Sequence, residues 1–444
     1  MDNKKVFFIG IGGIGISGIA CIYKQKNWIV SGSDEEKSEI TDGLKERGVK
    51  VFIGHKTSNL PQKTDLVVYS EAVPKTNPEL QQARKLKIKC LSGAQALADL
   101  AKDYFLIAVS GMHGKSTTAS MIASILVKAK FDPTFIIGTK PGWRLGKSKY
   151  LIIEADDYQA KFLNYYPDIL VLTNIEEEHM DFFKNFSHIK RVFEQYLRQV
   201  KNFIIANGDD TGIRKVLILN FKFLIFKPKV NFYSLKDKTA VELKKILKVP
   251  GEHNISNALA ALNAARVLGI KDKVSFKAFA EFKGIWRRFQ EERLVIGSMP
   301  LVIVSDYAHH PTEILATFQA LKERYGNPSA TSRTKRIWVV FQPHQYQRTF
   351  YLFKNFVKIF QQAKNKFGIE KIIITDIYSV KGRESQAIKK KVNSQKLIKA
   401  INRDFVEYVE QSKVGDYIKK NAKEIDVLTI MGAGSIYKLS NELK

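Results

Sequence analysis

Eleven short apolar runs, distributed along nearly the whole chain, constrain its fold more than any other feature of the sequence. Each run is rich in β-branched and aromatic residues, and helical patterns alternate with the runs almost throughout. Runs that are apolar at consecutive positions are typical of parallel strands buried on both faces of a sheet. The sequence therefore predicts an α/β fold, with strands at KVFFIG, WIVSGSD, DLVVYS, YFLIAVSG, YLIIEAD, DILVLTN, NFIIAN, LVIVSDY, RIWVVFQ, KIIITDI and VLTIMGAG.

The length of the chain indicates more than one domain. An ordinary domain has about 100 to 200 residues, and this chain has 444. We expect three sections, over residues 1–100, 101–293 and 294–444. The polar segment 326–336 has no apolar periodicity, so we expect an exposed loop there, within the third section.

Charge and hydropathy narrow the possible partners. The net charge is +28, but the lysines are spread over the whole chain. We therefore expect a solvated basic surface and no nucleic-acid partner, although a positive field attracts anionic small molecules. No stretch approaches the roughly 20 apolar residues of a membrane span, and the N-terminal residues enter a strand pattern without a secretory signal. We expect a cytoplasmic protein without membrane insertion, and Cys21 and Cys90 as inert core residues.

A glycine-rich turn follows the first predicted strand. Gly10, Gly12 and Gly15 precede a helical pattern, and Asp34 ends the next strand. Such glycines allow a pyrophosphate to approach the N-terminus of a helix, where free N–H groups favour anions. The pattern does not separate NAD from another nucleotide diphosphate, and glycines needed only for packing remain an alternative.

A second loop, in VSGMHGKSTTAS, has the Gly114-Lys115-Ser116 ending of a phosphate-binding loop. The usual loop has a glycine five residues before Gly114, where this chain has Val109, which we assign to the preceding strand. The loop lies between an apolar strand pattern and an amphipathic helix pattern. This context predicts that Lys115 contacts the β- and γ-phosphates of a nucleotide and that the Ser116 hydroxyl binds Mg²⁺.

Acidic side chains and a histidine follow the next two predicted strands. Glu154, Asp156 and Asp157 follow the first of them, and Asn174, Glu176 to Glu178 and His179 follow the second. In an open parallel sheet these strand ends lie at the edge that carries the phosphate loop. We expect functional roles for Glu154 and His179, and we expect Glu177 and Glu178 only to solvate a loop.

Two amides lie near the start of a later helix pattern. Asn254 and Asn257 are three residues apart and therefore lie on one helix face. Amides in this position suit adenine or ribose recognition. A polar surface role for Asn257 and an N-cap role for Asn254 are the alternatives.

Seven motifs resemble, in their order along the chain, those of the Mur ligase family. They are GMHGKST, EAD, TNIEEEHMD, GEHNISNALAA, WRRFQ, DYAHHPTE and FQPHQYQRT, and GIGGIGISGIA near the start and GAGSI near the end extend the resemblance. The family implies a Rossmann-like N-terminal domain for a UDP-sugar, a central P-loop-type ATPase domain with a mostly parallel sheet, and a Rossmann-like C-terminal domain for the amino acid.

The resemblance also implies an activity: ATP-dependent ligation of L-alanine to the muramate carboxylate of UDP-N-acetylmuramate through an acyl phosphate, in peptidoglycan precursor synthesis. ATP and Mg²⁺ are the implied cofactors, and a monomer or homodimer is expected. A ligase that joins a recycled murein peptide to the same UDP-sugar is the nearest alternative, and an NAD-dependent oxidoreductase or a basic nucleic-acid NTPase are more remote ones.

The resemblance assigns roles to residues that match the family's motifs. For the nucleotide these are Gly111, Met112, His113, Gly114, Lys115, Ser116, Thr117, Asn254, Asn257, Arg288 and Asp306. For metal ions they are Ser116, Glu154 and His179, and for the UDP-sugar Gly12, Gly13, Ile14, Gly15, Asp34 and Ser70. Tyr307, His309 and Arg348 match the side that receives the amino acid, and Lys115, Glu154, His179 and Arg288 are the implied catalytic residues.

Structural alternatives accompany these assignments. Arg288 could be a surface arginine, as we expect of its neighbour Arg287. His309 or His310, and above all His310, could cap the helix that begins at Pro311. The chain also departs from the family's pattern, with Met112 and Ser116 where threonine is usual, Tyr158 and Gln159 where small or acidic residues are usual, and Gln345 in place of an arginine. Segment 211–250 is shorter than usual, which predicts a reduced small sheet in the central domain.

Overall fold

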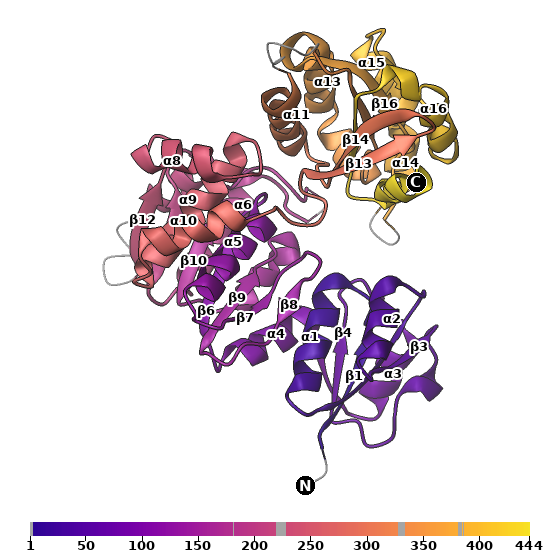
Figure 1. Cartoon of the computed structure of the whole chain (residues 1–444). Helices are drawn as coiled ribbons and strands as arrows, with labels where there is room; N and C mark the ends of the chain where they lie inside the picture. Colours follow the sequence, from indigo (N-terminus) through magenta and orange to yellow (C-terminus); the bar gives the residue numbers. More distant parts are fainter. Residues whose placement is uncertain (1–2, 181, 219–227, 327–333, 381–383, 385) are drawn as a thin grey trace. The chain divides into compact units, whose positions relative to one another are not determined.

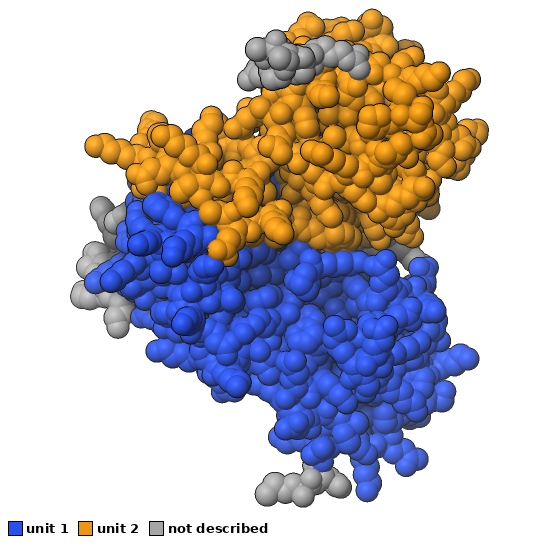
Figure 2. All heavy atoms as spheres, in the orientation of Figure 1, with its two compact units in different colours: residues 1–175, 190–234, 258–279 blue, residues 176–189, 235–257, 280–444 orange. Residues whose placement is uncertain are grey.

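The structure is a computed structural model that describes residues 3–180, 182–218, 228–326, 334–380, 384 and 386–444. The predicted α/β fold is confirmed, because strands and helices alternate along the chain and the strands form three sheets (Figure 1). Each of the eleven apolar runs forms a strand. The chain divides into two compact units, residues 1–175, 190–234 and 258–279 in unit 1 and residues 176–189, 235–257 and 280–444 in unit 2 (Figure 2).

The first sheet of unit 1 is entirely parallel, with the strand order β3-β2-β1-β4-β5. Its strands are β1 (Lys5–Ile9), β2 (Ile29–Asp34), β3 (Lys50–Ile53), β4 (Leu66–Tyr69) and β5 (Lys89–Ser92). The helices that alternate with them are α1 (Ile14–Gln25), α2 (Glu39–Glu46), α3 (Pro78–Lys85) and α4 (Gly93–Ala101). This doubly wound arrangement places the glycine-rich turn at the carboxyl end of the central strand β1.

The second sheet of unit 1 has the order β12-β11-β10-β6-β9-β7-β8, and only the β7–β8 pair is antiparallel. Its strands are β6 (Phe105–Ser110), β7 (Thr134–Ile136), β8 (Trp143–Arg144), β9 (Tyr150–Glu154), β10 (Ile169–Leu172), β11 (Phe203–Asn207) and β12 (Lys229–Tyr233). Because β9 and β10 flank β6, Glu154 and Asp157 after β9 and Asn174 after β10 lie beside the loop that follows β6.

The helices between residues 115 and 281 are α5 (Lys115–Lys128), α6 (Phe186–Leu197), α7 (Thr211–Ile218), α8 (Lys238–Ile246), α9 (Glu252–Val267) and α10 (Asp272–Glu281). The amphipathic prediction for α5 is wrong in one respect, because buried residues occupy most of its circumference rather than one face. Residues 219–227 of the short segment 211–250 lie outside the described residues, and the described remainder supplies α7, β12 and α8.

The sheet of unit 2 has the order β13-β14-β18-β15-β16-β17, and only the β13–β14 hairpin is antiparallel. Its strands are β13 (Gln290–Ile296), β14 (Met299–Asp306), β15 (Ile337–Phe341), β16 (Ile369–Ile374), β17 (Val406–Tyr408) and β18 (Val427–Met431). Its helices are α11 (Pro311–Tyr325), α12 (Tyr346–Tyr351), α13 (Phe353–Phe367), α14 (Gln386–Lys391), α15 (Ser394–Ile401), α16 (Val414–Lys420) and α17 (Leu439–Glu442). Short 3-10 helices are η1 (Thr57–Asn59), η2 (Tyr158–Asn164), η3 (Gln411–Lys413), η4 (Ala422–Glu424) and η5 (Ser435–Lys438).

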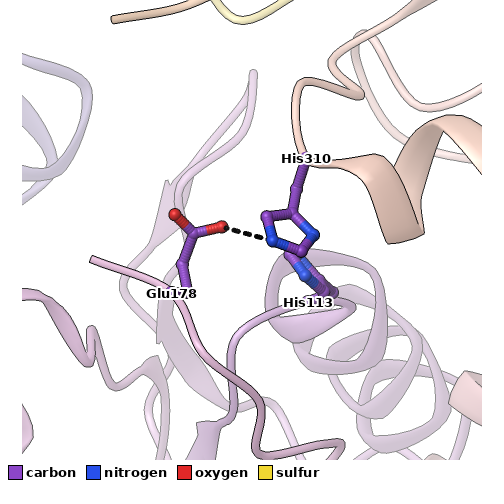
Figure 3. A group of neighbouring side chains, drawn as sticks. All are labelled: His113, Glu178 and His310. Atoms are coloured by element: carbon purple, nitrogen blue, oxygen red, sulfur yellow. Dashed lines mark ion pairs between the residues drawn. The ribbon is translucent and has the colours of Figure 1, made fainter. Parts of the chain in front are cut away.

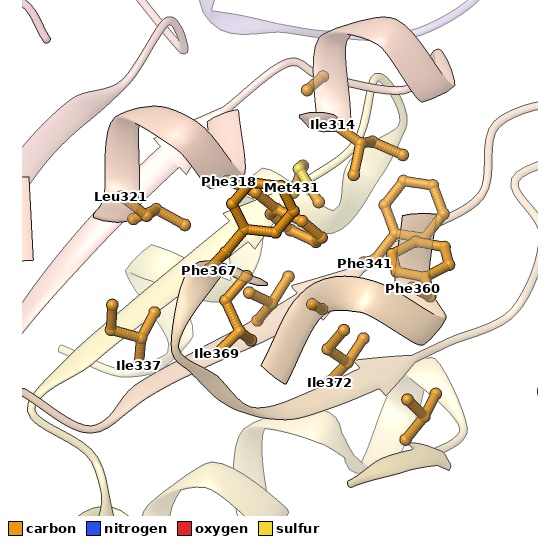
Figure 4. Close-up of a cluster of buried hydrophobic side chains, with 14 of the residues drawn as sticks. Ile314, Phe318, Leu321, Ile337, Phe341, Phe360, Phe367, Ile369, Ile372 and Met431 are labelled. Atoms are coloured by element: carbon orange, nitrogen blue, oxygen red, sulfur yellow. The ribbon is translucent and has the colours of Figure 1, made fainter. Parts of the chain in front are cut away.

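Two hydrophobic layers cover the two faces of this sheet. On one face the buried side chains of α11, α13 and α15 pack against alternate residues of the strands, with Phe318, Phe341 and Phe360 at the centre (Figure 4). On the other face α16 and α17 pack against the intervening residues, such as Trp338 and Val340. Burial of both faces explains why these strands read as continuous apolar runs in the sequence.

Two minor expectations have clear outcomes. Cys21 is buried in α1, and Cys90 in β5 is half-buried and packs against a core cluster that includes Phe7 and Val67. Most of the polar segment 326–336 lies outside the described residues, which leaves the predicted loop there as a prediction.

Within the part of the chain that the structure describes, none of the helices has the length and apolarity needed to cross a membrane.

Candidate active site

The phosphate loop connects β6 to α5 and is shaped by two glycines. Val109 lies in β6, as predicted, and its side chain is fully buried. Gly111 has φ 129° and Gly114, the N-cap of α5, has φ 80°, which are left-handed values that a side chain disfavours. This loop therefore bends at Gly111 and Gly114 and needs no glycine at position 109.

The end of β10 holds the phosphate loop in place. The Thr173 hydroxyl donates to the His113 carbonyl at 2.5 Å, and the Asn174 side chain both accepts from the His113 N–H at 2.9 Å and donates to its carbonyl at 3.1 Å. The Met112 N–H donates to the Asn174 carbonyl at 3.3 Å, and the Met112 side chain is buried. The loop thus presents an ordered backbone, and Thr117 is buried in the first turn of the helix that follows.

The Lys115 ammonium lies inside this loop. It donates to the carbonyls of Gly111 and Met112 at 2.6 and 2.9 Å, and it forms an ion pair of 2.7 Å with the fully buried Asp157 carboxylate. Burial by itself would lower the pKa of Lys115, but the carboxylates of Asp157, Glu154 and Asp156 outweigh it and raise that pKa above its usual value. Lys115 is therefore a permanent cation at the start of α5.

The Ser116 hydroxyl and the Glu154 carboxylate lie together beside the loop. Ser116 Oγ donates to Glu154 Oε2 at 2.8 Å, and the same carboxylate oxygen accepts from the Gly138 N–H at 2.9 Å. A hydroxyl and a carboxylate oxygen are hard donors of the kind that Mg²⁺ prefers. The residues present at this point fit a magnesium ion.

Glycines begin both α1 and α5, and neither helix has a side-chain cap at its N-terminus. Side chains of the N-cap residues accept from the first-turn N–H groups of α2, α3, α4, α11 and α15. Helices α8, α12, α13, α16 and α17 also lack such a cap, but their N-cap residues are not glycines. The free N–H groups of α1 and α5 and the positive ends of their dipoles can therefore bind anions. These are the two helices that the sequence assigned to phosphate groups.

The glycine-rich turn before α1 is held by Asp34. Asp34 Oδ2 accepts from the Gly12 N–H at 2.7 Å, and an added Cβ at Gly12 would lie 2.9 Å from that oxygen. Gly13 is the N-cap of α1, Ile14 is its first residue, and an added Cβ at Gly15 would have no atom within 4 Å. Packing therefore does not require Gly15. Ser70 follows β4, and its N–H donates to the Ile9 carbonyl at 2.9 Å.

In unit 2, the Glu313 carboxylate organises the residues after β14. It accepts from Arg288 Nη1 at 3.2 Å and from the His309 N–H at 3.0 Å, and it forms an ion pair with His309 Nδ1 at 3.0 Å. The His310 side chain accepts from the Thr312 N–H and caps α11, which confirms the capping alternative for that histidine. Glu313 completes the capping box at the start of this helix.

Asp306 and Tyr307 lie at the end of β14, next to this network. Both Asp306 oxygens accept backbone hydrogen bonds, from the Phe289 N–H at 2.8 Å and the Ala308 N–H at 2.7 Å. Burial raises the pKa of Asp306, although Arg288 opposes this effect. The Tyr307 ring centre lies 5.1 Å from the Arg288 guanidinium and 5.4 Å from the His309 ring centre.

Arg348, in α12, forms a buried ion pair with Glu178. Its Nε and Nη2 donate to Glu178 Oε1 at 3.0 and 2.9 Å, and the other carboxylate oxygen lies 3.6 Å from His310 Nε2 (Figure 3). Burial alone would raise the pKa of Glu178, but Arg348 and His310 hold it well below its usual value. The prediction that Glu178 only solvates a loop is wrong, whereas its neighbour Glu177 is exposed as predicted.

Arg287 also contradicts the sequence prediction of an exposed side chain. Only 4% of its surface is exposed, and its guanidinium donates to the carbonyls of Gly432 and Gly434. The rings of Trp286, Tyr307 and Tyr437 surround it. Arg288, in contrast, is half-buried and faces Glu313.

The remaining predicted residues of unit 2 lie near the N-terminal parts of α6 and α9. His179 has φ 55°, and its carbonyl accepts from the N–H groups of Phe182 and Phe183. Asn254 and Asn257 are buried in the first two turns of α9. Asn254 is not an N-cap, because α9 begins at Glu252 and the Asn254 side chain instead donates to the Pro250 carbonyl at 2.7 Å.

Four polar residues of these clusters make contacts that the sequence did not predict. They are Asp157, Thr173, Glu178 and Glu313. The capping-box spacing of His310 and Glu313 could have identified the last of them. The other three depend on contacts between segments that no local pattern connects.

Known proteins are similar to almost the whole chain. Three family models match the chain: "Mur ligase family, catalytic domain" over residues 5–105, "Mur ligase middle domain" over 109–265 and "Mur ligase, glutamate ligase domain" over 287–434. A UDP-N-acetylmuramate–L-alanine ligase of Acetivibrio thermocellus is 38% identical, with 98% of this chain and 94% of the relative aligned.

The chain belongs to the Mur ligase family.

A second relative of the same name, from Aquifex aeolicus, is 37% identical over 99% of this chain and 97% of its own length. Among solved Mur ligase structures, the UDP-N-acetylmuramate-alanine ligase of Thermotoga maritima has a TM-score of 0.78 at 24% identity and covers 99% of this chain and 98% of its own. A murein peptide ligase from Psychrobacter arcticus has a TM-score of 0.70 at 20% identity, with 99% of each chain covered. These structures share the fold, and the family assignment confirms the resemblance found in the motifs.

Proposed function

We propose that this Mur ligase joins L-alanine to the muramate carboxylate of UDP-N-acetylmuramate and uses ATP as the phosphoryl donor. Curated relatives that are 34–38% identical over 98–99% of this chain have this reaction in their names. The observation that carries the ATP-dependent part is the phosphate loop, where Lys115 is a buried cation and Ser116 contacts Glu154. We further propose that the reaction takes place in the cytoplasm and that the domains span residues 1–100, 101–293 and 294–444.

In the first step, an oxygen of the muramate carboxylate forms a bond to the γ-phosphorus of ATP, and the bond to ADP breaks. Both reactants are anionic, so positive charge must offset their repulsion. Lys115 supplies a permanent cation within the phosphate loop, and the free N–H groups at the start of α5 add donors for phosphate oxygens. We assign Gly111 to Thr117, Asn254, Asn257, Arg288 and Asp306 to this nucleotide.

Ser116 and Glu154 would hold Mg²⁺, and His179 is assigned to a metal ion by its match to the family motif. When bound, the ion neutralises phosphate charge and polarises the phosphoryl group that is transferred. The chain itself positions the two oxygen donors, since Glu154 ends β9 and Ser116 begins α5.

In the second step, the amine of L-alanine attacks the acyl carbon, the bond to phosphate breaks, and the ammonium proton is released. Arg348 would hold the α-carboxylate of the amino acid, and its Nε and Nη2 already bind a carboxylate, that of Glu178, at 3.0 and 2.9 Å. Tyr307 and His309 are assigned to the same substrate. The buried Glu178 anion keeps the guanidinium oriented.

The UDP-sugar is assigned to the N-terminal turn. Gly12, Gly13, Ile14 and Gly15 form the uncapped start of α1, which can accept the pyrophosphate, and Ser70 lies at the end of the neighbouring strand β4. Asp34 holds the turn through the Gly12 N–H.

Orthophosphate release tests the proposal. The purified full chain should release phosphate only when ATP, UDP-N-acetylmuramate, L-alanine and Mg²⁺ are all present, and Lys115→Ala should abolish that release. Lys128→Ala, at the exposed end of the same helix, is the matched control and should retain it. Equal release with a murein peptide in place of L-alanine would favour the recycling ligase, and no release with any amino acid or peptide would refute both functions.

A further inference from the structure

The segment that precedes β13 contains a buried arginine that the proposed reaction does not use. The Arg287 guanidinium donates to the carbonyls of Gly432 and Gly434, in the loop after β18. Its centre lies 4.5 Å from the ring centre of Tyr437 and 4.8 Å from that of Tyr307. The Trp286 ring centre lies 5.3 Å from the same guanidinium. This arginine therefore connects three separate segments of unit 2.

Hydrogen-bond acceptors and aromatic rings surround the Arg287 guanidinium. A buried cation is costly unless acceptors and aromatic faces replace its water, and here two carbonyls accept from Nη2 and three rings surround the guanidinium, while the buried Nε has no hydrogen-bond partner among the described residues. Burial lowers the pKa of Arg287 from its usual value, with the rings of Tyr307 and Tyr437 opposing that change. With 4% of its surface exposed and its Nη2 donating to two backbone carbonyls, this side chain is engaged with protein groups.

The backbone around Arg287 shows what that task is. Arg287 has φ 56° and Phe289 has φ 48°, both in the left-handed region that residues with side chains disfavour. The Arg287 carbonyl accepts from the Tyr307 N–H at 2.7 Å, and the Phe289 N–H donates to Asp306 at 2.8 Å. These two residues with left-handed φ are thus hydrogen-bonded to Asp306, which ends β14, and to Tyr307, which follows it.

Arg288 lies between these two strained residues and depends on their conformation. Its guanidinium lies 5.1 Å from the Tyr307 ring centre, and Arg287 lies 4.8 Å from the same ring. The Tyr307 ring is therefore in contact with two guanidiniums from adjacent residues. The backbone hydrogen bonds to Tyr307 and Asp306 hold these left-handed turns against the end of β14, and the Arg287 side chain adds a second attachment, to the loop after β18.

We propose that Arg287 is a positioning residue, which fixes Arg288 and Tyr307 by anchoring the turn before β13 to the loop after β18. The inference rests on the proposed function, in which Arg288 serves the nucleotide and Tyr307 the amino acid. It predicts that loss of the anchor impairs the binding of both substrates while the UDP-sugar, assigned to the N-terminal domain, binds as before.

Steady-state kinetics of three variants test this proposal. Arg287→Ala should raise the KM values for ATP and L-alanine at least tenfold each, and leave the KM for UDP-N-acetylmuramate within twofold. Arg287→Lys keeps the charge beside the rings but loses the planar guanidinium, whose Nη2 donates to both carbonyls, so its KM values should lie between those of the unsubstituted protein and the alanine variant. Arg293→Ala, on the exposed surface of β13, is the control and should change none of these values.

Amide hydrogen exchange gives a readout that needs no activity. The Tyr307 and Phe289 amides should exchange at least tenfold faster in Arg287→Ala than in the unsubstituted protein, while amides of α13 remain unchanged. A variant that loses kcat only in proportion to its folded fraction, with unchanged KM values and unchanged exchange at Tyr307, would overturn the proposal. If the unsubstituted protein released no phosphate, the proposed function would fail, and exchange at Tyr307 would still decide the role of Arg287.

Discussion

Replacement of Lys115 by alanine should destabilise the central sheet even without any substrate. The lysine side chain is 11% exposed and its partner Asp157 is fully buried, with 2.7 Å between Nζ and Oδ1. Removing one partner of a buried ion pair costs about 3–5 kcal/mol, because the other charge loses its compensation. The carbonyls of Gly111 and Met112 lose their charged donor in the same variant.

The pH of the measurement does not limit this prediction. Lys115 has a raised pKa in the folded protein, so its contribution to stability is fully present below the unfolded value of about 10.4 and is lost only as the pH rises through the folded pKa. At pH 7 the whole effect is therefore observed.

Hydrogen exchange of the slowest amides in β6 and α5 is the appropriate assay, because it reports the opening of this sheet separately from the other domains. A loss of about 3–5 kcal/mol corresponds to exchange that is faster by about two to four orders of magnitude. The double variant Lys115→Ala/Asp157→Asn lacks the uncompensated carboxylate and should exchange more slowly than Lys115→Ala alone. Exchange within threefold of the unsubstituted protein, or a double variant as labile as the single one, would refute the reasoning.

Three further predictions concern single residues. Gly111→Ala should raise the KM for ATP at least tenfold, because Gly111 has φ 129° and an added Cβ would collide with the Thr173 hydroxyl. An unchanged KM would contradict this account of the loop. Arg348→Ala should raise the KM for L-alanine far more than that for ATP, and equal changes would show that the arginine does not hold the amino acid. The pKa of Glu178 is well below its usual value, because Arg348 and His310 outweigh the effect of burial. The ionised Glu178 therefore stabilises the folded protein above the unfolded pKa of about 4.3, and this contribution is lost as the pH falls through the folded pKa. Urea unfolding should therefore show Glu178→Gln to be less stable than the unsubstituted protein at pH 7 but increasingly similar below pH 4, whereas a pH-independent difference would exclude the ion pair as its cause.

Much of the fold could be predicted because its signals are local. The eleven apolar runs became strands, and the GKS loop lies between β6 and α5, since strand burial and loop chemistry are both specified by neighbouring residues. Short edge strands such as β8 and β17 carry no comparable apolar signal and were not predicted. Their pairing is set by the sheet they join.

Polar pairs were the weaker part of the prediction. Glu178 and Arg287 were expected at the surface, because one belongs to an acidic run and the other adjoins a second arginine. Both are buried because protein groups replace their hydration. Arg348 pairs with Glu178, and aromatic rings surround Arg287.

The sequence by itself determined the α/β class, the phosphate loop and the family, because these depend on periodicity and on contiguous motifs. Only the tertiary structure decided which charges are paired. Lys115 and Asp157 are 42 residues apart, Arg287 and Gly432 are 145 apart, and Arg348 and Glu178 are 170 apart. Burial of a charge is decided by the partner that folding brings to it, and that partner is specified by strand order and helix packing rather than by any local pattern.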